Sequence, residues 1–146
     1  MKTDIQLVQN AVSLFGVTVF SIEDILYMGI RKWMAYAFMV SGLLMSLILR
    51  SPMETALSAL PGLILLILGL VTKEKIGYGD AATAIGLGLW AGCKAAAWCV
   101  LFGLGLSSVV SIIYMAYIKI KGLSGKKTIP FIPFLLFGLV VSIVSV

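Results

Sequence analysis

Apolar residues along this chain of 146 residues fall into long runs, separated by short stretches that carry most of the charged side chains. A helix of about 20 residues crosses the hydrocarbon core of a membrane, because each residue advances the helix by about 1.5 Å. The pattern therefore predicts an all-α integral membrane protein with about six transmembrane helices, in a single domain over residues 1–146. The predicted helices cover about residues 5–22, 33–49, 56–72, 81–93, 94–118 and 130–146.

The breaks between these runs coincide with residues that interrupt helices. Pro52, in the stretch RSPMET, separates the second run from the third, because proline cannot donate a backbone hydrogen bond within a helix. The stretch from Ala81 to Ile118 is roughly twice the length of one span, and Gly92 and Lys94 mark its expected turn. Small residues permit close helix packing inside a membrane, and we expect it at three glycines of the fourth run: Gly86, Gly88 and Gly92.

The composition supports membrane spans and excludes several classes of function. Hydrophobic residues make up 61% of the chain and the mean hydropathy is +1.13, whereas soluble proteins have about 45–50% apolar residues. The chain has no histidine, and its two cysteines, Cys93 and Cys99, do not form a Cys-x-x-Cys pattern. Zinc sites, the usual haem sites and histidine-based triads need such residues, so we expect no metal and no cofactor.

The distribution of basic residues predicts the orientation in the membrane. With six spans, eight of the 11 lysine and arginine residues fall on one side and three on the other, and the excess marks the cytoplasmic side. Both termini are then expected on the outer side. The net charge of +5 reflects this bias, so we expect no nucleic-acid partner. The residues on the cytoplasmic side are Arg31, Lys32, Lys73, Lys75, Lys119, Lys121, Lys126 and Lys127.

Two aspartates, Asp24 and Asp80, are predicted at the cytoplasmic ends of two different helices. Ionisable side chains at membrane depth are costly and usually paired or functional, so we expect the bundle to bring the two carboxyl groups together. The apolar pattern runs straight through Asp24, and its neighbour Glu23 faces about 100° away, so only one of them points into the bundle. Asp80 has a simpler alternative role, as the N-cap residue of the helix that follows it.

A close pair of carboxyl groups has a chemistry of its own. Because two like charges repel, one group keeps a proton, and the pair can then act as general base and general acid. Peptide hydrolysis by this route needs neither a metal nor a histidine. Gly77 and Gly79 precede Asp80 and are expected to form a deformable turn that lets a substrate backbone approach. We expect a side chain at position 79 to displace Asp80 or the substrate.

Several stretches of the chain resemble a known family of enzymes. GYGD at residues 77–80 matches the Gly-x-Gly-Asp signature of intramembrane aspartyl proteases. DILYMGIRKWM at 24–34, GYGDAATAIGLGLWAGCKAA at 77–96 and KKTIPFIPFLLFGLVVSI at 126–143 are similar to segments of type IV prepilin peptidases. These stretches occur in the family's order and cover almost the whole chain.

The resemblance implies a multi-pass aspartic endopeptidase of a prokaryotic cytoplasmic membrane. It implies that Asp24 and Asp80 are the catalytic pair and that Gly77 and Gly79 form the signature turn. The implied substrate is a type IV pilin-like precursor of pilus assembly or protein secretion, whose basic leader is removed at the cytoplasmic face. Members that also N-methylate the product carry a cysteine-bearing cytoplasmic region that this chain lacks, so peptidase activity alone is expected.

The chain departs from the family pattern at two positions, and two other functions stay open. GIRKW stands where an Ile-Pro pair is usual after the first aspartate, and Ala82 stands where a lysine is usual after the second. A presenilin-type intramembrane protease shares the Gly-x-Gly-Asp signature, although it has Tyr-Asp where this chain has Glu23 and Asp24. A small transporter or channel in which the two aspartates relay protons or ions is the non-enzymatic alternative.

Overall fold

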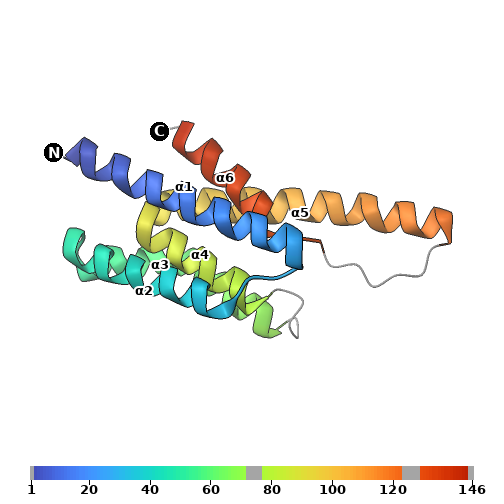
Figure 1. Cartoon of the computed structure of the whole chain (residues 1–146), viewed down its shortest axis with the longest axis horizontal. Helices are drawn as coiled ribbons and strands as arrows, with labels where there is room; N and C mark the ends of the chain where they lie inside the picture. The colour runs from blue at the N-terminus through green and yellow to red at the C-terminus, as the bar shows by residue number, and fades with distance from the viewer. Residues whose placement is uncertain (1, 72–76, 123–128, 145–146) are drawn as a thin grey trace.

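The computed structural model describes residues 2–71, 77–122 and 129–144, and these residues form six helices and no strand (Figure 1). The all-helical prediction is thereby confirmed. Within the described ranges, four helices are long and apolar enough to cross a membrane: α1 from Asp4 onward, α2, α3 and α5. The helices are α1 (Lys2–Tyr27), α2 (Lys32–Leu49), α3 (Pro52–Val71), α4 (Tyr78–Ala91), α5 (Cys93–Lys121) and α6 (Ile132–Val144).

The break before α3 and the break after α4 have local causes. Pro52 is the first residue of α3, where its missing N–H group has no helical partner to lose. The Ser51 N–H donates to Glu54 Oε2 (3.1 Å) and the Glu54 N–H donates to Ser51 Oγ (3.3 Å), which is a capping box. Gly92 joins α4 to α5 with φ 96°, a conformation that favours glycine, so the predicted turn is confirmed.

Helix α4 is the central element of the bundle and packs against α1, α2, α3 and α5 (Figure 1). Its buried residues occur on every side, as expected of a helix surrounded by others. A Cβ atom at Gly86 would lie 2.6 Å from the Phe38 ring of α2, and one at Gly88 would overlap the Ser58 carbonyl of α3. The predicted close packing is confirmed at both glycines, where the absence of a side chain lets neighbouring helices approach.

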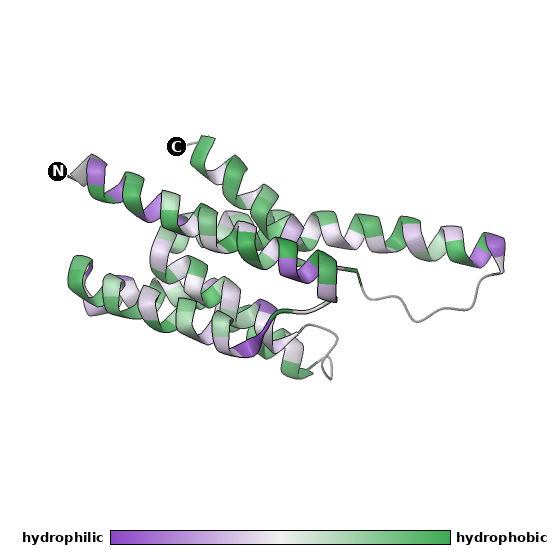
Figure 2. Ribbon diagram, in the orientation of Figure 1, coloured by the Kyte–Doolittle hydropathy of each residue, from purple (hydrophilic) through white to green (hydrophobic). Residues whose placement is uncertain are grey.

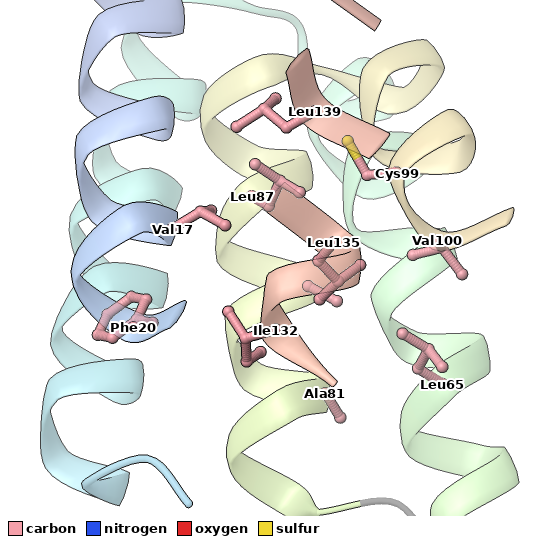
Figure 3. Close-up of a cluster of buried hydrophobic side chains, with 11 residues drawn as sticks. Val17, Phe20, Leu65, Ala81, Leu87, Cys99, Val100, Ile132, Leu135 and Leu139 are labelled. Atoms are coloured by element: carbon pink, nitrogen blue, oxygen red, sulfur yellow. The ribbon is translucent and has the colours of Figure 1, made fainter. Parts of the chain in front are cut away.

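Helix α6 completes the core by packing against α5 and α1. A Cβ atom at Gly138 would lie 2.8 Å from the Cα of Cys99, so α6 and α5 also meet backbone to backbone. Figure 3 shows side chains from five helices converging on one cluster. Its members are Val17, Phe20, Leu65, Ala81, Ala84, Leu87, Cys99, Val100, Ile132, Leu135 and Leu139.

The outer surface of the bundle is apolar, as membrane spans require. Phe15, Ile48 and Ile112 are 74%, 77% and 68% exposed, and Figure 2 shows hydrophobic residues along the outward faces, with most hydrophilic residues near helix ends. Both termini lie at the same end of the bundle (Figure 1), which agrees with an even number of crossings. Which end faces the cytoplasm stays a prediction, and Lys73, Lys75, Lys126 and Lys127 lie outside the described residues.

Candidate functional site

Asp24 lies on the face of α1 that points into the bundle. Gln9, Ser13, Val17 and Phe20 are all buried and precede it at intervals of three or four residues, which is the spacing of one helical face. Asp24 is the last buried residue of this stripe and is 5% exposed. The helical periodicity of the sequence therefore places a carboxyl group inside the bundle, near the end of α1.

Glu23, the alternative acidic residue, faces a different direction. Its Oε1 lies 3.8 Å from Nε of Arg31, which stands just before α2, and the side chains of Arg31 and Glu23 are 62% and 16% exposed. Glu23 therefore forms an ion pair with a residue in the connection between α1 and α2. The prediction that only one of the two adjacent acidic residues points into the bundle is confirmed, and the inward one is Asp24.

The Asp24 carboxylate is held by the beginning of α6. The Ile132 N–H donates to Asp24 Oδ2 at 3.1 Å. The first N–H groups of a helix have no partner within the helix, and the helix dipole favours a negative group there. Asp24 thus caps α6 from α1 and has a fixed orientation. Sequence reasoning missed this contact, although the IPFIPF stretch at 129–134 marks the place where α6 begins.

Asp80 lies in the first turn of α4. The N-cap residue of α4 is Gly77, with φ −67° and ψ 139°, so the alternative role of Asp80 as N-cap is wrong. The Gly77 N–H instead donates to the Asp80 carboxylate, as the N-cap N–H does to an acidic residue at the third helical position in a capping box. The Thr83 hydroxyl donates to the Gly79 carbonyl (2.8 Å), which further closes this turn.

The structure brings Asp24 and Asp80 together at one end of the bundle. Helices α1 and α4 are in contact, and the two carboxyl groups are close enough to interact electrostatically. Ile132 of α6 donates its N–H to Asp24, and Ala81 of α4 follows Asp80 in the chain. Both residues lie in the same core cluster (Figure 3). We call Asp24 and Asp80 the aspartate pair.

The two signature glycines contribute space rather than an unusual backbone conformation. Neither has positive φ; among the described glycines only Gly92 and Gly122 do. A Cβ atom at Gly77 would lie 3.3 Å from Asp80 Oδ2, whereas one at Gly79 would lie 3.5 Å from the Cβ of Ile30. A side chain at position 79 would therefore meet Ile30 and not Asp80, so the expected displacement of Asp80 is wrong, whereas displacement of the substrate stays a prediction. Position 77 is the one that adjoins the carboxylate.

Among the described residues, no third acidic side chain, histidine or cysteine joins the aspartate pair to form a metal site. Ala82 is 4% exposed, so the position that lacks the expected lysine is filled by a buried methyl group. Among the residues that the structure describes, no three His, Cys, Asp or Glu side chains gather where a metal ion could bind.

A comparison with protein families gives a match over most of the chain. The model of the family described as "Type IV leader peptidase family" matches residues 11–144, a range that includes Asp24, Gly77, Gly79 and Asp80. No curated protein and no solved structure matches the chain.

Proposed function

Because this chain belongs to the type IV leader peptidase family, we propose that it is an aspartic endopeptidase whose catalytic residues are Asp24 and Asp80. The observation that carries the proposal is that these two carboxyl groups, from the contacting helices α1 and α4, lie close enough to interact electrostatically at one end of a membrane bundle. The family match also favours a peptidase over a transporter or channel that uses the same aspartates.

The aspartate pair supplies both proton transfers that peptide hydrolysis needs. One carboxylate accepts a proton from water while the water oxygen attacks the carbonyl carbon of the peptide bond. The other carboxyl group, which is protonated, donates its proton to the amide nitrogen as the carbon–nitrogen bond breaks. The pair ends the cycle with one proton, as it began. The Ile132 N–H keeps the Asp24 carboxylate oriented for this role.

The proposed substrate is a type IV pilin-like precursor, cleaved after its basic leader at the cytoplasmic membrane face of a prokaryotic cell. Two findings support this assignment. The family match indicates leader peptidases as a group, and the aspartate pair lies at the end of α1 away from the N-terminus. With both termini outside, as the basic residues predict, that end faces the cytoplasm.

Co-expression with a candidate precursor tests the proposal through removal of the leader, scored on a gel. Asp24→Asn and Asp80→Asn should each lower the cleavage rate by about 100-fold or more, because an amide cannot transfer the proton. The amide of the Asp24→Asn variant keeps an oxygen that accepts the Ile132 N–H, so the protein should still accumulate in the membrane. Glu23→Gln is the matched control and should cleave normally, because Glu23 pairs with Arg31 and does not belong to the aspartate pair.

Two results would contradict these assignments. Normal cleavage by both asparagine variants would show that the aspartate pair is not catalytic. Loss of cleavage in Glu23→Gln, with normal turnover in Asp24→Asn, would move the first catalytic role to the neighbouring residue.

A further inference from the structure

A polar cavity lies at the end of the bundle opposite to the aspartate pair. It has a volume of about 490 Å³, and its lining includes Gln6 and Arg50, which also line an adjoining cavity of about 340 Å³ beside Gln9. We call the two together the polar cavity. Gln9 precedes Asp24 by 15 positions on α1, which corresponds to about 22 Å along a helix. The polar cavity is therefore separate from the proposed catalytic site.

Arg50 is anchored in the wall of the polar cavity. Its guanidinium donates to the carbonyls of Leu89 (3.0 Å) and Trp90 (3.1 Å) in the last turn of α4, where the helix dipole favours a cation. Burial lowers the pKa of the Arg50 guanidinium from its ordinary value, and the Glu54 carboxylate opposes that shift. Because arginine remains protonated in proteins, the cavity has a fixed positive charge.

Gln9 presents an unused hydrogen-bond donor beside this charge. The side chain is 6% exposed, and its Oε1 accepts a hydrogen bond from Arg50 at 3.5 Å. Its Nε2 is buried and has no partner among the residues that the structure describes. A buried donor without an acceptor costs free energy, so the arrangement favours a ligand that supplies oxygen atoms at this point.

The two remaining charges of the polar cavity are compatible with a bound anion. Lys94 also lines the cavity and is exposed, so its ammonium group can reach a ligand. The Glu54 carboxylate also lines the cavity, but its single negative charge is outnumbered by the positive charges of Arg50 and Lys94. The donors of the cavity are thus an amide and cationic groups, which are the partners that phosphate oxygens bind.

The position of the polar cavity indicates where such a phosphate comes from. Its walls are built where α2 ends at Leu49, α3 begins at Pro52 and α5 begins at Cys93, and all three helices are candidate membrane spans. The ends of membrane spans lie at the depth of the lipid headgroups. We propose that the polar cavity binds the phosphate of an anionic phospholipid headgroup, with Gln9 Nε2, Arg50 and Lys94 as its partners.

Thermal unfolding of the purified full chain in a neutral detergent tests this site. A short-chain phosphatidylglycerol should raise the unfolding midpoint by several degrees through ligand linkage, and equal concentrations of short-chain phosphatidylcholine or inorganic phosphate should not. Gln9→Glu keeps an oxygen for Arg50 but replaces the free donor with a negative oxygen. It should weaken phosphatidylglycerol binding by about tenfold or more.

Lys94→Gln is the second variant, and it decides the question if Gln9→Glu fails to fold. It should also weaken phosphatidylglycerol binding, whereas Lys119→Gln, the same charge change near the other end of α5, should leave it unchanged. An equal response to both lipids, or unchanged binding in the folded Gln9 or Lys94 variant, would overturn the proposed site. A matching shift with inorganic phosphate alone would overturn the lipid assignment.

Discussion

At the scale of single residues, the adjacent acidic residues Glu23 and Asp24 of α1 have different roles. Asp24 continues the buried stripe of the helix and accepts a hydrogen bond from Ile132, while Glu23 pairs with Arg31. Helical periodicity predicts that only one of the two points inward, and the structure shows that this residue is Asp24. The Ile132 contact could not be predicted, because it joins residues 108 positions apart and depends on how α6 docks.

The space available for a side chain differs between Gly77 and Gly79, which leads to a prediction with an internal control. Gly77→Ala should lower the cleavage rate by about tenfold to 100-fold, because its Cβ presses on the Asp80 carboxylate, and small misplacements of catalytic groups are costly. Gly79→Ala adds an ordinary contact with Ile30 and should leave Asp80 in place. The measurement is cleavage rate relative to protein level in the membrane.

The outcome at these two glycines separates two roles. Wild-type cleavage by Gly77→Ala would mean that the Asp80 carboxylate tolerates the added methyl group. A loss of cleavage in Gly79→Ala at normal protein level would indicate that substrate, rather than Asp80, occupies the space beside that glycine.

Met28 ends α1 in a strained conformation and allows a test of local stability. Its φ is 52°, and its N–H donates to the Asp24 carbonyl at 2.9 Å, as in a helix that ends with a left-handed residue. Met28→Gly should stabilise the protein by roughly 1 kcal/mol, because glycine adopts this conformation without a Cβ clash. Met28→Val should destabilise it. The order of unfolding midpoints checks this, and a valine variant as stable as wild type would contradict it.

At the scale of elements, the apolar runs predict the helices well and their first turns less well. Helix α3 begins at Pro52 rather than near residue 56, because the Ser51–Glu54 capping box starts it among polar residues. Helix α4 begins at Tyr78 rather than Ala81, which places Asp80 inside its first turn. Both helix starts depend on capping interactions of polar groups, which a hydropathy pattern does not detect.

The packing of α4 against α3 gives a prediction at this scale. A Cβ atom at Gly88 would overlap the Ser58 carbonyl, so Gly88→Ala should push the two helices apart and destabilise the fold by about 1–3 kcal/mol. Gly105 of α5 has no such neighbour within 4 Å. Gly105→Ala should therefore be neutral or stabilise the protein by up to about 1 kcal/mol through helix propensity.

Unfolding midpoints in detergent compare these two alanine variants directly. If Gly88→Ala were as stable as Gly105→Ala, the close approach of α3 and α4 would not contribute to stability.

At the scale of the whole molecule, the two ends of the bundle have different chemistry. The aspartate pair lies at one end, and the polar cavity lies at the other, near the N-terminal part of α1. Sequence reasoning predicts that the two aspartates share an end, because alternating spans and basic residues determine which ends coincide. It does not predict the polar cavity, since Arg50 reaches Gln9, Leu89 and Trp90 only in the folded bundle.

The orientation of these two ends in the membrane is the last prediction. The connection between α2 and α3 lies at the end that holds both termini, and the last turn of α5, with Lys119 and Lys121, lies at the other end (Figure 1). The basic excess then predicts that a tag inserted after Lys121 faces the cytoplasm and one after Glu54 faces outward. Labelling of the tags in intact and permeabilised cells measures this. A cytoplasmic tag at position 54 would place the polar cavity inside the cell and the aspartate pair at the outer face, away from the proposed precursor leader.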